Sequence, residues 1–289
     1  MHRISLILSQ ARRGGFTWEF LLDKMEVEFG IQGLEGGYSI RTFQRDLTTI
    51  REVYGIDIQF NKRLKKYLIN EDDSEPIRMH LLESLDIINA FELASDLGQF
   101  VFFDGRRAGG TEHLSPLIGA IKKRVKVRFR HFKNWIETED FREVSPLALK
   151  QVKYSWYLIA LNEKEELRNY GLDRIHDLST TPQKFERPEN LNFKEYYQHV
   201  FGILNDSTLP VENILLHFSK QQGHYIRSMP IHPSQIIEKD DENGLIVSLQ
   251  LKINHELISE ILSYGDQVKV LEPEVLSERV RRIANKITR

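Results

Sequence analysis

Short strand-like segments follow one another between residues 125 and 175, and they constrain the fold more than any other feature of the chain. VKVRFRHF alternates strictly between apolar and basic residues, as a strand does when one of its faces is buried. REVSPLALK, YSWYLIALN and RNYGLDRI supply three more strand-like segments. Several short strands this close together favour a small barrel or a strongly curved sheet. We therefore predict a β-rich domain at residues 116–182.

Residues 1–70 instead have the pattern of three helices followed by a hairpin. Ser39 is a good N-cap for the third helix, and Gly55 is a good stop for it. Apolar residues recur in this helix at steps of three and four, which predicts one buried stripe. The stripe consists of Ile40, Phe43, Leu47, Ile50 and Tyr54.

The opposite side of that third helix is polar, and the hairpin after it has a basic tip, NKRLKK. Two helices, a polar-faced third helix and a basic-tipped hairpin are the layout of a winged helix-turn-helix. In that fold the third helix enters the major groove of DNA and the hairpin tip meets phosphate. The alternative is a solvated helix face and a tip that only aids solubility. Both features in this order favour DNA binding, by Ser39, Arg41, Thr42, Gln44, Arg45, Lys62, Arg63 and Lys65.

The rest of the chain divides into connections and one further domain. Residues 71–115 begin with the acidic, proline-ended NEDDSEP and continue as a helical linker. Residues 183–210 are predicted to be a second linker with one short helix at FKEYYQHVFG. Residues 211–289 have the order β-α-β-β-α-β-α, which fits a ferredoxin-like domain. The predicted class is therefore a multi-domain α+β protein.

Charge and composition narrow the range of possible functions. The net charge is −2, yet residues 1–67 carry 11 Lys and Arg against 8 Asp and Glu, and residues 116–182 carry 13 against 9. Two mildly basic blocks suit a binder of anions. The absence of cysteine excludes disulfides, thiolate zinc sites and a cysteine nucleophile. Without a catalytic motif or metal-ligand spacing, we expect no enzyme activity, cofactor or metal.

The apolar segments are all short. None approaches the roughly 20 residues that a membrane span needs, and MHRISLILSQARRGG lacks the long apolar region and cleavage site of an export signal. We expect a cytoplasmic protein that does not contact the membrane.

Three motifs point to a family. SWYL at residues 155–158 follows REVSPLAL and precedes R-x-Y-x-LDRI at 168–175, and together they resemble the WYL domain of bacterial transcriptional regulators. SIRTFQRDL resembles the recognition helix of the winged helix-turn-helix that usually precedes this domain. IRSMPIHPSQ resembles part of the C-terminal extension domain that often follows it.

The resemblance implies a homodimeric transcription factor whose WYL domain, a small Sm- or SH3-like barrel, senses a nucleotide or nucleic acid. The positions that match the proposed pocket of the family are Arg142, Tyr157, Arg168 and Arg174. Two positions depart from the pattern: Gly171 stands where many members have arginine, and Phe129 where many have tyrosine.

The residues themselves add detail to this pocket. Arginine presents a planar fork of donors that matches phosphate, and Tyr157 offers a hydroxyl and a ring for stacking. Arg130 lies on a basic strand face that could extend the surface, whereas Trp156 and Leu158 share the opposite face from Tyr157 and are expected in the core. Arg174 and Asp173 fit a structural ion pair with a neighbouring strand equally well.

Two hypotheses follow. In the first, the protein binds a double-stranded DNA operator, and an anionic effector in its WYL domain controls that binding. In the second, it is an accessory protein whose barrel holds single-stranded nucleic acid.

Overall fold

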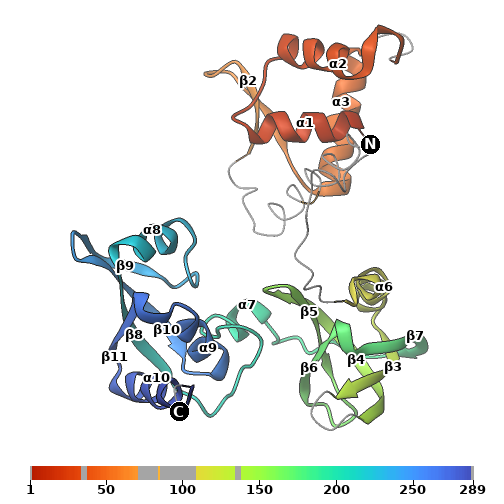
Figure 1. Cartoon of the computed structure of the whole chain (residues 1–289). Helices are drawn as coiled ribbons and strands as arrows, with labels where there is room; N and C mark the ends of the chain where they lie inside the picture. The colour runs from red at the N-terminus through yellow and green to blue at the C-terminus, as the bar shows by residue number, and fades with distance from the viewer. Residues whose placement is uncertain (1, 34–37, 71–83, 85–108, 134–137, 288–289) are drawn as a thin grey trace. The chain divides into compact units, whose positions relative to one another are not determined.

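The computed structural model describes residues 2–33, 38–70, 84, 109–133 and 138–287. The chain divides into two compact units, Met1–Asp104 and Gly105–Arg289, coloured red to orange and yellow to blue in Figure 1. Most of the predicted helical linker, at 71–115, lies outside the described residues. No helix in the described part of the chain is both long and apolar enough to span a membrane.

The first unit holds its helices and hairpin in the predicted order. They are α1 (His2–Arg12), α2 (Trp18–Gly33), α3 (Ile40–Thr49), a π-helical turn (Ile50–Tyr54), and the antiparallel strands β1 (Ile58–Asn61) and β2 (Lys66–Ile69). The Ser39 hydroxyl accepts from the backbone N–H of Thr42, and Gly55 ends the helical segment with a φ of 67°. Both capping predictions are confirmed.

The apolar stripe of α3 differs from the prediction at one end. Phe43 and Ile50 are fully buried, but Ile40 is 46% exposed. The reason is Asp46, which is buried on the side of Phe43 away from Ile40. At 3.6 residues per turn, Asp46 and Ile40 lie on opposite sides of Phe43 around the helix. Because Asp46 is buried, the buried face is shifted toward it and Ile40 lies at the edge of that face.

The WYL-like region forms one five-stranded antiparallel sheet in the order β6-β5-β4-β3-β7. Its strands are β3 (Val125–Lys133), β4 (Thr138–Val152), β5 (Ser155–Leu161), β6 (Leu167–Gly171) and β7 (Ile175–Lys184). The long β4 pairs with β3 through its first half and with β5 through its second, so the sheet bends along this strand. Among the described strands β6 and β7 are the two edges. The described part of the chain thus forms a curved sheet and not the closed barrel that was predicted.

A short helix covers one face of this sheet. Helix α6 (Leu114–Lys123), preceded by a 3-10 turn at Thr111–His113, packs Leu117 and Ala120 among the core side chains. The sequence prediction assigned residues up to 115, and so the start of this segment, to the helical linker. Leu158 is fully buried in the same core and Trp156 packs against it, as predicted.

The second predicted linker, at residues 183–210, is in fact packed. Its helix α7 (Phe193–Tyr196) ends sooner than predicted, and the chain beyond it buries Tyr197, Val200 and Ile203 against Ile159 of β5. The side chains of this segment are apolar at positions that face β5, so it forms a small core of its own. We call residues 193–206 the strap.

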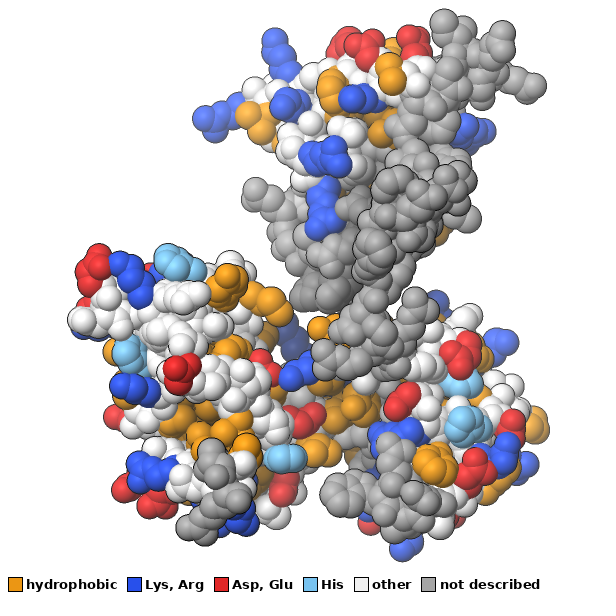
Figure 2. All heavy atoms as spheres, viewed as in Figure 1, with side chains coloured by type: hydrophobic (Ala, Val, Ile, Leu, Met, Phe, Trp, Pro, Cys, Tyr) orange, Lys and Arg blue, Asp and Glu red, His pale blue; other side chains and the backbone are white. Residues whose placement is uncertain are grey.

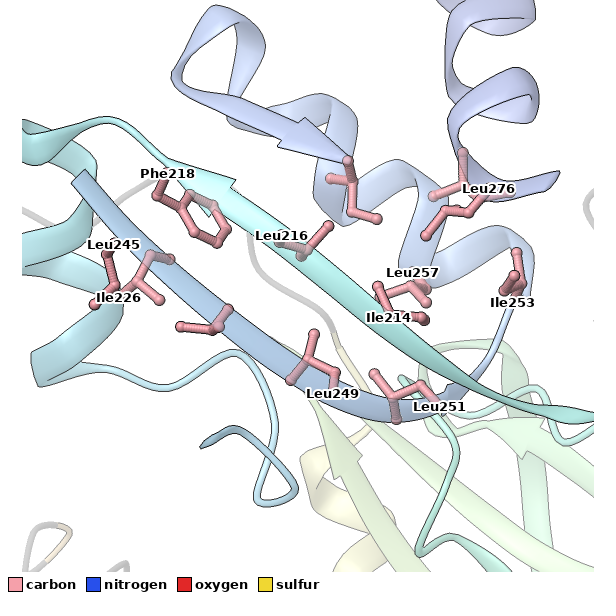
Figure 3. Close-up of a cluster of buried hydrophobic side chains, with 13 residues drawn as sticks. Ile214, Leu216, Phe218, Ile226, Leu245, Leu249, Leu251, Ile253, Leu257 and Leu276 are labelled. Atoms are coloured by element: carbon pink, nitrogen blue, oxygen red, sulfur yellow. The ribbon is translucent and has the colours of Figure 1, made fainter. Parts of the chain in front are cut away.

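The last part of the chain has the predicted element order. It comprises β8 (Val211–Phe218), α8 (Lys220–Ser228), β9 (Ile236–Asp241), β10 (Gly244–Lys252), α9 (His255–Ser263), β11 (Val268–Glu272) and α10 (Glu274–Ile287). The sheet order is β11-β8-β10-β9. Figure 3 shows alternate residues of β8 and β10, such as Leu216 and Leu249, turned toward Leu257 of α9 and Leu276 of α10. Burial of these side chains holds the helices on the sheet.

Candidate functional site

The exposed face of α3 carries cations that no described residue neutralises. Arg41, Gln44 and Arg45 are exposed, and neither arginine forms an ion pair with any described residue. Ser39 and Thr42 lie at the start of the helix, where their hydroxyls are 3.0 Å apart. These two predicted DNA-binding residues therefore also build the N-cap.

Asp46 fixes which way this face points. The buried carboxylate accepts a hydrogen bond from the Tyr38 hydroxyl at 2.9 Å and one from Arg3 Nε of α1 at 3.2 Å. Burial, and then the hydrogen bond to Asp46, raise the pKa of Tyr38 well above its usual value. The neighbouring Arg45 takes no part in this network and stays in solvent.

The hairpin tip carries the remaining predicted DNA-binding residues. Asn61 Oδ1 accepts from the backbone N–H groups of Arg63 and Leu64 at 3.0 Å and closes the turn. Lys62, Arg63 and Lys65 are exposed and, within the described residues, have no ion pair. Lys and Arg side chains stand out from the surface of this unit in Figure 2.

In the second unit, a hollow of about 410 Å³ is lined by residues of β3, β4 and β6 and of the turn before β6. It brings together Arg142 and Arg168, two of the predicted effector residues, with Tyr170 between them in electrostatic reach of both. Burial raises the pKa of Tyr170, and the two positive charges act in the opposite direction. The lining residues are His131, Arg142, Glu143, Val144, Asn162, Glu163, Lys164, Glu166, Arg168, Asn169 and Tyr170.

Both pocket arginines already have carboxylate partners. Arg142 Nη2 lies 2.6 Å from Asp140 Oδ2, and Arg168 Nη2 lies 2.6 Å from Glu166 Oε2. All four side chains keep a third or more of their surface in solvent. An entering anion can therefore exchange with these carboxylates at little cost, because exposed ion pairs are weak.

The other three predicted effector residues lie elsewhere, because successive residues of a strand point to opposite faces. Arg130 points away from the core and is held by Asp177 at 2.6 Å and Glu139 at 2.9 Å. Tyr157 lies on the strap side of the sheet. There burial raises the pKa of Tyr157 and the nearby Arg174 partly offsets the rise. Tyr157 is thus grouped with Arg174 and not with Arg142 and Arg168.

The structure around residue 171 explains why glycine stands there. A Cβ atom at this position would lie 2.7 Å from Arg174 Nη2 and 2.5 Å from Asp173 Oδ1. The Arg174 guanidinium thus lies where a side chain of residue 171 would begin. Arg174 and Asp173 approach each other at 3.8 Å, so this contact joins adjacent residues and is not the predicted ion pair with a neighbouring strand. Phe129, the second departure, is fully buried in the core.

Sequence reasoning missed His131 and Tyr170 as pocket residues. Their rings meet edge to face with centroids 5.3 Å apart. Tyr170 could have been found, since it follows Arg168 by two positions on one strand and so shares its face. His131 could not, because it reaches the pocket from another strand. In the described part of the chain no group of three or more His, Asp or Glu side chains is arranged to hold a metal.

Comparison with known proteins identifies two domains. Residues 112–180 match the family model of the WYL domain, and residues 210–288 match that of the WCX domain. The chain therefore carries a WYL domain followed by a WCX domain. The pocket, the curved sheet and α6 all belong to the WYL domain. No curated protein matches the chain.

Two solved structures resemble it at low identity. One is proteasome accessory factor B/C (PafBC) of Arthrobacter aurescens, with 21% identity and a TM-score of 0.37 over 97% of this chain and 46% of that one. The other is described as a CRISPR Cas-related protein, with 12% identity and a TM-score of 0.40 over 99% of this chain and 84% of that one. The chain thus spans less than half the length of the PafBC chain.

Proposed function

We propose that the protein is a DNA-binding transcriptional regulator in which the first unit is a winged helix-turn-helix. The observation that carries this proposal is a difference in charge pairing. Arg41, Arg45 and the hairpin-tip residues Lys62, Arg63 and Lys65 have no ion-pair partner among the described residues. By contrast, four arginines on the strands of the WYL domain are paired with carboxylates, namely Arg128, Arg130, Arg142 and Arg168. Cations held exposed and unpaired on one helix and one hairpin tip suit the phosphates and base edges of a duplex.

The proposal assigns separate tasks to the two parts of this surface. Arg41 and Gln44 lie in the first turns of α3, the end that reaches deepest into a major groove, so they read bases. The hairpin tip binds phosphate without sequence preference. We further propose a homodimer on a two-fold-symmetric operator, with the ferredoxin-like WCX domain at the far end of the chain.

The test is a pair of double variants. Arg41→Ala with Arg45→Ala should weaken binding to duplexes that the protein selects from a random library by at least about 30-fold, because each arginine is expected to contribute about 1–3 kcal/mol. The control is Lys24→Ala with Arg51→Ala, which removes the same charge. Lys24 lies over the Phe20 ring and Arg51 is bonded to Asp57, so neither cation is free. Fluorescence anisotropy measures both, and equal binding by the two variants contradicts the proposal.

We also propose that the hollow at Arg142, Arg168 and Tyr170 takes the anionic effector. An anion there would replace the Asp140 and Glu166 carboxylates as the partner of the two arginines. Arg142→Ala with Arg168→Ala should then abolish heat of binding for mononucleotides and short 5′-phosphorylated oligonucleotides in calorimetry. Arg130→Ala is the matched control, since Arg130 is equally paired but lies on the other face. Retained binding in the double variant rules out this site.

A further inference from the structure

Helix α10 presents a second set of cations without partners, far along the chain from α3. Arg281, Arg282 and Lys286 are exposed and form no ion pair with any described residue. With Glu278 and Asn285 they line one shallow hollow of about 390 Å³. Steps of three, four and five residues place these five side chains on one face of the helix.

Several cations elsewhere in the WCX domain form ion pairs, unlike those on this face of α10. Lys220 lies 2.5 Å from Glu242, Arg227 lies 2.7 Å from Asp240, and Lys239 lies 2.6 Å from Asp241. Described residues of the same domain thus neutralise three cations on α8 and β9 but none of the three on this face of α10. Even with Glu278 counted, the α10 face carries a net charge of +2.

The inner side of α10 holds the helix firmly in place. Leu276 is fully buried, and Arg279 Nη1 donates to the carbonyl oxygen of Ile253 at 2.9 Å. The exposed cations are therefore mounted on a fixed element and do not depend on a loop. Arg281 and Lys286 are separated by five residues, or about 7.5 Å along the axis, so a single extended chain of phosphates can meet both.

We propose that this face of α10 binds the phosphodiester backbone of nucleic acid. Arginine forks match phosphate oxygens in pairs. The five lining residues include no apolar side chain, whereas the centre of a protein–protein interface is apolar and poor in charge. Interfaces with nucleic acid are polar and strongly basic. Lys286 also lies in the last turn, where a cation offsets the helix dipole, so the two arginines carry most of the argument.

The proposal goes beyond the assignment of α3, because it gives the WCX domain a nucleic-acid contact of its own. The test uses the full-length protein and two fluorescent probes, a single strand of thymidylate and a mixed-sequence duplex. The variant is Arg281→Ala with Arg282→Ala and Lys286→Ala. Its matched control is Lys220→Ala with Arg227→Ala and Lys239→Ala, which removes the same charge from paired cations.

We expect the α10 variant to bind at least one probe about tenfold more weakly at low salt. Its salt dependence should be shallower by roughly 0.7–0.9 in slope for each phosphate that the variant no longer binds. The control should bind like the wild type. Arg281→Lys with Arg282→Lys keeps the charge and should restore part of the affinity, which separates a direct contact from misfolding. The probe that responds identifies single strand or duplex as the ligand.

Equal weakening by the α10 variant and its control overturns the inference, because net charge alone then explains the effect. Unchanged binding of both probes by the α10 variant also overturns the inference. A wild type that binds neither probe overturns it as well. In either case an acidic protein partner would be the better interpretation of this face. The Arg41 and Arg45 double variant separates the two proposals. If it loses duplex binding while the α10 variant binds both probes like the wild type, only the assignment of α10 fails.

Discussion

Asn169 of β6 donates from its side-chain nitrogen to the backbone carbonyl oxygen of Ile203 in the strap, at 3.0 Å. The two flanking residues, Arg168 and Tyr170, point into the pocket on the other face of the same strand. One short edge strand therefore touches the pocket with one face and the strap with the other. The Asn169 oxygen also accepts from the Tyr197 hydroxyl at 3.2 Å.

We predict that Asn169→Ala lowers the free energy of unfolding by about 1–3 kcal/mol. The change leaves the Tyr197 hydroxyl and the Ile203 carbonyl, both largely buried, without their partner. Urea denaturation measures the loss. Gln151→Ala is the control, because Gln151 is exposed and makes one marginal contact at 3.5 Å. A loss no larger than in the control would mean that the strap is held by apolar contacts alone.

Two glycines should respond differently to alanine. At Gly171 the backbone φ of −64° suits any residue, and a Cβ would meet only the ends of the Arg174 and Asp173 side chains. Gly171→Ala should therefore cost less than about 1 kcal/mol.

At Gly202 the φ is +84°, and a Cβ would press on the Glu256 carboxylate. That carboxylate accepts the backbone N–H groups of Ile203 at 2.9 Å and Leu204 at 2.8 Å. Gly202→Ala should cost about 2–4 kcal/mol, from backbone strain and these weakened bonds together. Thermal unfolding of both variants checks the order, and an equal loss would contradict it.

Adjacent residues of α3 should separate stability from binding. Asp46→Ala removes the partner of Tyr38 and Arg3 and should destabilise the first unit by about 2–3 kcal/mol. Arg45→Ala should leave stability within about 0.5 kcal/mol, because exposed side chains without partners contribute little. Arg45→Ala should nevertheless weaken duplex binding. Circular dichroism melts and anisotropy report the two effects, and destabilisation by Arg45→Ala would show that the residue is structural.

His232 should make the protein less stable as the pH falls. Its Nδ1 accepts the backbone N–H of Ser234 at 3.1 Å, and burial, then the positive charges of His199 and Lys150, lower its pKa from 6.5 to about 4. The unfolded chain binds the proton first, so the stabilisation is complete above pH 6.5 and is lost between there and pH 4. Allowing for partial exposure of the ring, the loss is about 1–2 kcal/mol.

His232→Asn should flatten this pH dependence. Urea denaturation from pH 7 down to about pH 5 compares the wild type, this variant and His176→Asn, whose ring is exposed. The His176 variant should follow the wild type. If the His232 variant follows it as well, other groups account for the loss of stability.

Local patterns in the sequence predicted much of the secondary structure. Period-two alternation located β3. Ser39 and Gly55 marked both ends of the third helix, because a cap and a left-handed glycine act within one turn of their own position. Local sequence patterns did not predict the features that depend on burial against distant parts of the chain. The Asp46 network turned α3 away from Ile40, and apolar contacts with Ile159 converted a predicted linker into the strap.

The candidate pocket was predictable only in part. Alternation separates Tyr157 from Trp156 and Leu158, and it likewise groups Arg168 with Tyr170. That Arg142 joins this pair, while Arg174 turns to the Tyr157 side, depends on how β4 pairs with β3 and β5, and on how β6 pairs with β5.

The sequence by itself determined the order of helices and strands and the positions of basic residues along the chain. Both can be read from residues that lie close together in the sequence. Only the tertiary structure decided which of those cations are neutralised. Carboxylates such as Asp177, which lies 47 residues from Arg130 along the chain, come within bonding distance only when the strands pair. The cations of α3 and α10 stay open because no carboxylate of the described residues folds back to them.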